Sequence, residues 1–219
     1  MESIVAPAHE GSIARLRVVM LSAAYTKPVD FVHEGFVGAV RERGLDVDLV
    51  FARPGLLEQR EREVAERLRS EFLAPARAQG VALWLGGISL GGYAALCCAV
   101  EHATELAGLC LFAPYLGSHI TTGEIRRAGG IGNWRTPELA DDDYERRIWR
   151  FIAAQERSVP AIHLGLGRED RFLERQRLFA DALDTECVNI IPGGHDWPTW
   201  RRLWENFLDA RIATPKSAG

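Results

Sequence analysis

A short segment between residues 83 and 93 constrains the fold more than any other part of the chain. It contains the pattern Gly-x-Ser-x-Gly at Gly87, Ser89 and Gly91. Such a pattern is typical of a sharp turn from a strand into a helix, which lifts the serine hydroxyl clear of a sheet. The run before it is apolar, and the run after it is rich in small apolar residues, as a strand and a packed helix require. The alternative is a glycine-rich turn with an incidental serine, and only the other segments of the chain can distinguish the two interpretations.

The order of the other segments predicts an α/β protein with a mostly parallel sheet and helices on both of its faces. Apolar, β-rich runs predict strands at Leu16–Ser22, Val47–Phe51, Val81–Leu85, Leu106–Phe112, Ala161–Leu166 and Cys187–Ile191. The intervening stretches predict helices at Val29–Arg43, Leu56–Gln79, Gly91–Val100, Glu138–Gln155 and Arg171–Leu183. The length of 219 residues is accounted for by a single domain, which we expect over residues 1–212. Residues 213–219 are expected to form a flexible tail.

The stretch 114–160 interrupts this alternation. Five glycines between Gly117 and Gly132 form a loop ahead of the acidic, tryptophan-containing helix expected at Glu138–Gln155. Loops of this length are uncommon and often functional. Residues 114–160 are therefore either a lid or small cap inserted into the domain, or a surface excursion before a crossover helix.

Charge and cysteine usage exclude several classes of function. The formal net charge is −4, and 26 basic residues are scattered among 30 acidic ones, whereas nucleic acids and acidic lipids require clustered positive charge. The four cysteines lie in apolar segments without metal-ligand spacing. No apolar run approaches the roughly 18 residues of a membrane span, and the N-terminus does not resemble a signal peptide. We expect a soluble, cytoplasmic protein without a nucleic-acid or membrane partner.

A catalytic serine needs a histidine base and a carboxylate that orients the histidine. His195 fits the first role, because it follows an expected strand and a Pro-Gly-Gly break at the carboxyl edge of the sheet. His163 lies within an expected strand and is better explained as a core residue. The four remaining histidines lie on expected surface helices or loops: His9, His33, His102 and His119.

Asp170 is the candidate acid. It follows the expected strand Ala161–Leu166 and precedes His195 by 25 residues, in the chain order Ser, Asp, His. Glu169 competes with it, and so does Asp196, although a residue rarely folds back onto the ring of its sequence neighbour. Asp170 could also cap the following helix, and the two roles can coexist.

Acyl transfer further requires N–H donors for the negative oxygen that develops on the substrate. Leu90 supplies one by its position after the serine. We assign the second to Ala24, in a segment of small residues after an early strand, with Tyr25 as the alternative. Tyr25 and Trp197 are candidate substrate-binding residues, on the acyl side and beside His195 respectively. Trp197 also belongs to a tryptophan stripe at helical spacing, which is more often part of a core.

Taken together, Gly87-Ile88-Ser89-Leu90-Gly91, Asp170 and Gly193-Gly194-His195-Asp196-Trp197 resemble the α/β-hydrolase family over nearly the whole chain. The last motif is similar to the ending of the putative-esterase group, which includes enterochelin, feruloyl and formylglutathione esterases. The resemblance implies ester hydrolysis by Ser89, His195 and Asp170, without a metal or organic cofactor. Many members have His-Gly in the early loop where this chain has Ser22-Ala23, a departure that concerns the oxyanion donor and not the fold.

The expected function is therefore a serine hydrolase that cleaves a small carboxylic ester or thioester through an acyl-enzyme. An acyltransferase or peptidase would use the same triad, because a fold does not determine a function. A catalytically idle hydrolase fold that binds a small ligand is the alternative from another class. The sequence contains no feature that specifies an oligomeric state.

Overall fold

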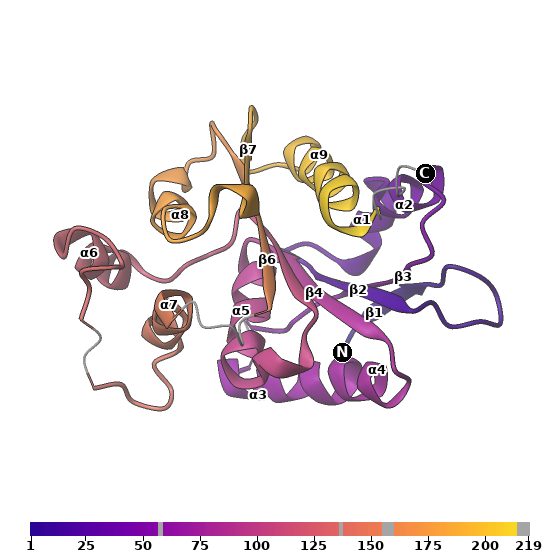
Figure 1. The fold of residues 1–219 in the computed structure, drawn as a ribbon, viewed down its shortest axis with the longest axis horizontal. Helices are drawn as coiled ribbons and strands as arrows, with labels where there is room; N and C mark the ends of the chain where they lie inside the picture. Colours follow the sequence, from indigo (N-terminus) through magenta and orange to yellow (C-terminus); the bar gives the residue numbers. More distant parts are fainter. Residues whose placement is uncertain (57–58, 136–137, 155–159, 214–219) are drawn as a thin grey trace, which may run out of the picture.

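A seven-stranded sheet forms the centre of the computed structural model, which describes residues 1–56, 59–135, 138–154 and 160–213. The strands are β1 (Ser3–Ala6), β2 (Leu16–Leu21), β3 (Asp48–Ala52), β4 (Ala82–Ile88), β5 (Gly108–Phe112), β6 (Ala161–Gly167) and β7 (Val188–Ile191). Their order across the sheet is β1-β3-β2-β4-β5-β6-β7. Strands β2 to β7 are parallel, and β1 is antiparallel to β3 (Figure 1). The predicted α/β class is confirmed, and the six predicted strands correspond to β2 to β7.

The short strand β1 was not predicted. It pairs only with β3 at the edge of the sheet, in a register that places Ser3 opposite Ala52. Its four residues alternate between exposed and half-buried positions. So short a segment with one half-covered face carries too little apolar periodicity to be recognised from sequence.

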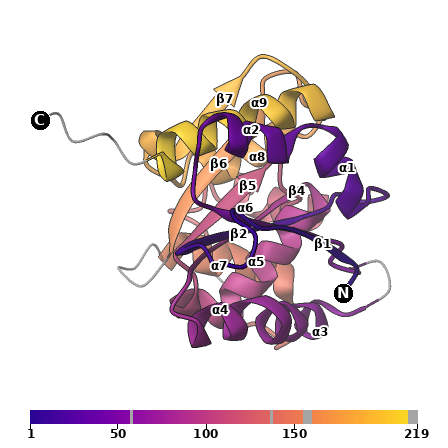
Figure 2. The same ribbon diagram turned by 90° about the vertical axis from the view of Figure 1, so that its right-hand side faces the viewer.

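Two layers of helices cover the sheet (Figure 2). The described helices are α1 (Pro28–His33), α2 (Phe36–Glu42), α3 (Glu61–Leu68), α4 (Ala74–Ala78), α5 (Leu90–His102), α6 (His119–Arg127), α7 (Tyr144–Ala154), α8 (Leu173–Ala180) and α9 (Trp197–Phe207). Helices α1, α2 and α9 pack on one face and share a core that contains Phe31, Phe36 and Trp204. Helices α3, α5, α7 and α8 contribute to the core of the other face. Both faces of the central strands are therefore buried, which explains their nearly continuous apolar sequence.

Several helices differ from their predicted extents. The predicted helix Val29–Arg43 is divided into α1 and α2 by Gly35, whose φ of 80° does not continue a helix. The predicted helix Leu56–Gln79 becomes α3, a π-helical turn at Arg69–Leu73 and α4. Residues 57 and 58 of that prediction lie outside the described residues. Helix α8 is shorter than predicted at both ends.

The stretch 114–160 contains two helices where one was predicted. Helix α6 lies in the predicted glycine-rich loop, and the Ser118 side chain accepts the Thr121 N–H at its start. Helix α7 begins at Tyr144, later than predicted, and Gln155 lies outside the described residues. The Trp149 side chain is fully buried, and its Nε1 donates to the Leu116 carbonyl at 2.9 Å. A lid or cap role for this stretch stays a prediction.

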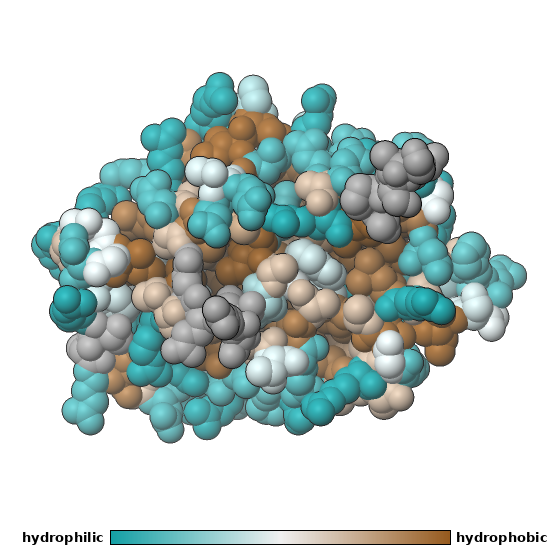
Figure 3. Space-filling view, in the orientation of Figure 1, coloured by the Kyte–Doolittle hydropathy of each residue, from teal (hydrophilic) through white to brown (hydrophobic). Residues whose placement is uncertain are grey.

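The space-filling view shows the face of the molecule seen in Figure 1. Polar residues lie around most of the edge of this face, and apolar side chains reach the surface in its middle (Figure 3). Among the described helices, none combines the length and the apolar composition needed to cross a bilayer. The predicted tail falls almost wholly on residues 214–219, which lie outside the described part of the chain.

Candidate active site

Ser89 lies in the turn between β4 and α5, in a backbone conformation that residues other than glycine rarely adopt. Its φ is 52° and its ψ is −112°. A non-glycine residue in such a region adds about 1–3 kcal/mol of backbone strain to the folded state, and it persists only where the surrounding structure holds it in place. A Cβ at Gly87 would collide with the backbone of Gly91, and a Cβ at Gly91 would collide with the Leu21 carbonyl. The glycines of the motif are therefore required because strand, turn and helix are in direct backbone contact.

Backbone hydrogen bonds hold this turn from both sides. The Ser89 N–H donates to the Phe112 carbonyl at the end of β5, at 3.0 Å. The Ser89 carbonyl accepts the Tyr93 N–H at 3.2 Å and the Tyr115 N–H at 2.9 Å. The candidate nucleophile thus has its backbone bonded to its own helix and to the end of the neighbouring strand.

Asp170 and His195 meet at the same edge of the sheet. Asp170 follows β6, His195 follows β7, and the His195 Nδ1 lies 2.7 Å from the Asp170 Oδ2. The Asp170 side chain is fully buried, whereas 15% of the His195 side chain is exposed. A carboxylate that accepts from Nδ1–H leaves the other ring nitrogen, Nε2, unprotonated and able to take a proton.

The Asp170 carboxyl is held by further donors. Its Oδ1 accepts the Phe172 N–H at 2.8 Å, and the Gln176 Nε2 lies 3.4 Å from its Oδ2. Burial by itself would raise the pKa of Asp170, but the hydrogen bonds from His195 and from the Phe172 N–H hold that pKa below its usual value. The bond to the Phe172 N–H, two residues on, is an Asx turn. Helix α8 begins only at Leu173, so Asp170 is not the N-cap of a helix starting at Arg171.

The two competing carboxyl groups have other partners. The Glu169 side chain accepts the Gly193 N–H, and the Glu169 N–H donates to the Gly193 carbonyl at 3.0 Å. Asp196 caps α9 by accepting from the backbone N–H of Thr199 at 3.0 Å and from its hydroxyl at 2.7 Å. Glu169 thus fixes the loop ahead of the histidine, while Asp196 fixes the helix after it.

Two aromatic rings that were not predicted as site residues enclose the imidazole. The centroids of Phe172 and Trp200 lie 5.2 and 5.1 Å from that of His195, both in edge-to-face geometry. Phe172 closes the Asx turn of Asp170, and Trp200 follows Trp197 at helical spacing in the tryptophan stripe; neither position signals a contact with His195. Trp197 is half-buried and packs on Phe31 and Phe36.

The predicted oxyanion donors lie together. Leu90, Ala24 and Tyr25 line one hollow of about 20 Å³, which is room for about one water molecule. Leu90 is the first residue of α5, where backbone N–H groups lack partners within the helix. Tyr25 has a φ of 63° and a side chain that is 94% exposed. Their roles as donors and substrate contacts stay predictions.

Ser89 and His195 both follow parallel strands and lie at the carboxyl edge of the sheet, with β5 and β6 between β4 and β7. The hydrogen bonds of the described residues do not include one between the Ser89 hydroxyl and the His195 ring. Such bonds are often long in a free enzyme and shorten when substrate binds. Within the described part of the chain, no group of three or more His, Cys, Asp or Glu residues is arranged to hold a metal ion.

Comparison with known proteins places the chain in a family. A family model described as putative esterase matches residues 58–208, which include Ser89, Asp170 and His195. An acetyl esterase of Caldicellulosiruptor saccharolyticus is 25% identical over 161 residues, which cover 67% of this chain. The matched part spans 60% of the length of that relative.

Solved structures show the same fold. An S-formylglutathione hydrolase (FrmB) from Staphylococcus aureus has a TM-score of 0.59 and 11% identity, over 88% of this chain and 79% of its own. A thermophilic esterase from Thermogutta terrifontis has a TM-score of 0.59 and 16% identity, over 94% and 91%. The matched family model and the shared architecture show that the chain belongs to the putative esterase family and has the α/β-hydrolase fold.

Proposed function

We propose that the protein is a serine hydrolase that cleaves a small carboxylic ester or thioester. The observation that carries the proposal is the 2.7 Å contact between His195 and the buried Asp170, at the sheet edge where the turn at Ser89 also lies. A histidine oriented by an ionised carboxylate, together with a serine in a strained turn, is what nucleophilic acyl transfer requires.

In the proposed mechanism the His195 Nε2 takes the proton of the Ser89 hydroxyl, and the Ser89 Oγ attacks the acyl carbonyl. The N–H groups of Leu90 and Ala24 donate to the oxygen that becomes negative. His195 then gives its proton to the leaving alcohol or thiol. Water, activated by His195, hydrolyses the acyl-enzyme and restores Ser89. Asp170 stays ionised throughout and stabilises the imidazolium.

The proposed acyl group is short. The hollow beside Leu90 has a volume of about 20 Å³, which leaves room for an oxyanion next to the proposed donors. The relative from Caldicellulosiruptor is named an acetyl esterase, which supports a short acyl group. The solved S-formylglutathione hydrolase supports testing thioesters beside oxygen esters.

The first test is covalent labelling with a fluorophosphonate probe. The wild-type protein should be labelled and Ser89→Ala should not. Ser70→Ala is a matched control, because the Ser70 hydroxyl only donates to the Arg67 carbonyl on an exposed helical turn, and it should be labelled like wild type. An unlabelled wild-type protein would contradict the proposal.

The second test identifies the substrate with aryl esters and thioesters of increasing acyl length. Acetyl compounds should have the highest kcat/KM, and the value should fall as the acyl chain grows. Adding an alcohol acceptor separates hydrolysis from acyl transfer, because a transferase would produce the new ester in preference to the free acid. Label formation without turnover of any ester would contradict the proposed substrate class.

A further inference from the structure

The peptide group between Ser89 and Leu90 has two functions at once. A trans peptide is planar, so its C=O and N–H point in opposite directions and cannot turn independently. The N–H of this group is the proposed oxyanion donor of Leu90, and its C=O is the Ser89 carbonyl. Whatever holds the Ser89 carbonyl therefore also aims the Leu90 N–H.

The Ser89 carbonyl has a partner outside its own helix. The Tyr93 N–H bond, at 3.2 Å, is the first turn of α5, whereas the Tyr115 N–H reaches it at 2.9 Å from the loop between β5 and α6. The rings of Tyr93 and Tyr115 also meet edge to face, with centroids 5.3 Å apart. The position of Tyr115 thus bears directly on the direction of the Leu90 N–H.

The loop that carries Tyr115 is strained. Ala113 has a φ of 46° and Gly117 a φ of 98°. The Ala113 N–H donates to the Gly165 carbonyl of β6 at 2.9 Å, which fixes the start of the loop. A loop with a non-glycine residue in this region keeps its shape only where other contacts determine it. The part of the loop after Ala113 therefore also needs a contact that holds its shape.

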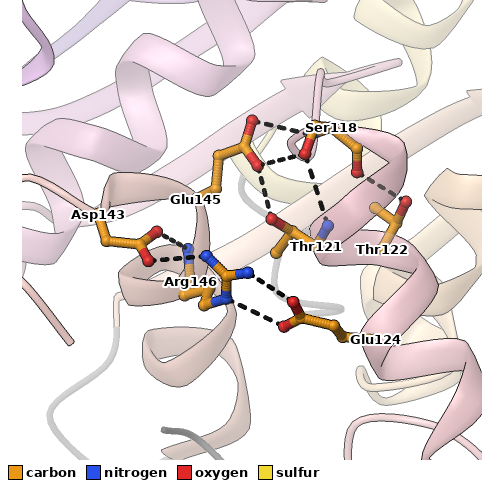
Figure 4. A network of polar contacts seen from close by, with 7 residues as sticks. All are labelled: Ser118, Thr121, Thr122, Glu124, Asp143, Glu145 and Arg146. Atoms are coloured by element: carbon orange, nitrogen blue, oxygen red, sulfur yellow. Dashed lines mark hydrogen bonds and ion pairs between the residues drawn. The ribbon is translucent and has the colours of Figure 1, made fainter. Parts of the chain in front are cut away.

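Glu145 of α7 supplies it with four hydrogen bonds. Its Oε1 accepts from the Tyr115 hydroxyl at 3.1 Å and from the Ser118 N–H at 2.8 Å. Its Oε2 accepts from the hydroxyls of Ser118 at 2.9 Å and Thr121 at 2.6 Å (Figure 4). Bonds to an ionised acceptor are about twice as strong as neutral ones. One carboxylate therefore holds both Tyr115 and the end of its loop.

We propose that Glu145 is a positioning residue of the oxyanion site. Its carboxylate fixes the loop of Tyr115, the Tyr115 N–H fixes the Ser89 carbonyl, and that carbonyl sets the direction of the Leu90 N–H. The inference rests on the proposed function, because it assigns the Leu90 N–H to the substrate oxygen. Among the described residues, the hydrogen bonds of Glu145 go to Tyr115, Ser118 and Thr121 and not to Ser89, so its effect on the site is indirect.

The proposal predicts which kinetic constant changes. Oxyanion donors act on a charge that exists only in the transition state, so aiming them wrongly lowers kcat and leaves KM unchanged. Losing one donor outright costs about 10²–10³ in kcat, and Glu145→Gln, which only loosens the donor, should cost roughly tenfold. A rise in KM at constant kcat would overturn the inference, since it would make Glu145 a ground-state binding group.

Glu124→Gln is the matched control. Glu124 joins the same two helices through Arg146, with its Oε2 3.0 Å from the Arg146 Nε (Figure 4). The hydrogen bonds found among the described residues do not connect Glu124 to the Tyr115 loop. If Glu145 acted only by packing α6 on α7, both variants would lower kcat in proportion to their loss of thermal stability. We expect kcat of Glu124→Gln to equal wild type, and equal kcat values for the two variants would overturn the inference.

Tyr115→Phe tests the same path with the fold intact. It removes only the hydroxyl bond to Glu145 and keeps both the ring and the backbone N–H. It should lower kcat less than Glu145→Gln does, and the double variant should lose less than the product of the two effects. Additive effects would overturn the proposed path. Labelling of the wild type by fluorophosphonate separates the two hypotheses: a labelled wild type with unaffected variants refutes this inference alone, while an unlabelled wild type refutes the proposed function.

Discussion

The Asp170 Oδ2 lies 2.7 Å from the His195 Nδ1, although the two residues come from different strands and are 25 positions apart. The histidine ring is further enclosed by Phe172 and Trp200. The three contacts restrain the orientation of the ring, and an ionised Asp170 favours the tautomer that leaves Nε2 free. Each contact can be removed by a separate substitution.

Asp170→Asn should lower kcat by several orders of magnitude with little effect on folding. An amide in this position can donate to Nδ1, which would select the tautomer with the proton on Nε2, and the equivalent change in another triad enzyme costs about 10⁴. The measurement is kcat for a short aryl ester. Glu169→Gln is the control, because Glu169 holds Gly193 and not the ring. A larger loss in Glu169→Gln than in Asp170→Asn would reverse the assignment of the acid.

Phe172→Ala should reduce kcat about threefold to tenfold. Edge-to-face aromatic contacts contribute about 0.5–1.5 kcal/mol, and here the contact restrains the ring that transfers the proton. Phe172→Leu, which retains apolar volume, should recover part of the loss. Because Phe172 is partly exposed, urea unfolding of Phe172→Ala should stay near that of wild type, which separates a kinetic effect from a loss of stability.

The protein should lose stability as the pH falls from 6.5 to 4, because of His163. This histidine lies in β6 with an exposure of 3%, and neither of its ring nitrogens has a hydrogen-bond partner among the described residues. Burial, with a contribution from Arg211, lowers its pKa from 6.5 to about 4. The unfolded chain therefore binds a proton in this range that the folded chain does not, so stability falls as the pH falls from 6.5 to 4, by up to about 3 kcal/mol.

The measurement is the free energy of unfolding in urea at a series of pH values. His163→Leu should flatten the profile between pH 6.5 and 4, whereas His33→Gln, at an exposed position, should leave it unchanged. Asp170 affects stability at a lower pH. Its pKa is lower in the folded state than in the unfolded chain, so it stabilises the folded state above the unfolded pKa, and this contribution is lost as the pH falls through the folded pKa. An unchanged slope in His163→Leu would refute the assignment.

Gly91→Ala should destabilise the protein by about 1–3 kcal/mol or prevent folding, as overpacked positions do. The added Cβ would collide with the carbonyls of Leu21 and Ser22. Gly132→Ala is the control, since a Cβ there meets no atom of the described residues within 4 Å and Gly132 does not have a positive φ. Thermal unfolding compares the two, and a Gly91→Ala protein as stable as wild type would contradict the packing of the turn.

Local patterns were sufficient to predict much of the fold and to propose the candidate triad. Parallel strands buried on both faces are apolar runs, and residues such as Ser89, Asp170 and His195 follow them in recognisable turns. The edge strand β1 was missed because half of it faces solvent, and α6 because Gly123 and the glycines after it are unusual in helices. The contacts of His195 with Phe172 and Trp200, and of Glu145 with Tyr115, depend on how distant segments pack, which no local pattern encodes.

The edge-to-face contact between Trp200 and His195 also has an optical consequence. Because the two rings are in contact, the emission of the wild-type protein minus that of Trp200→Phe should differ from the same difference measured in a His195→Ala background, without any substrate present. The protein has in this indole a built-in optical reporter beside its proposed general base.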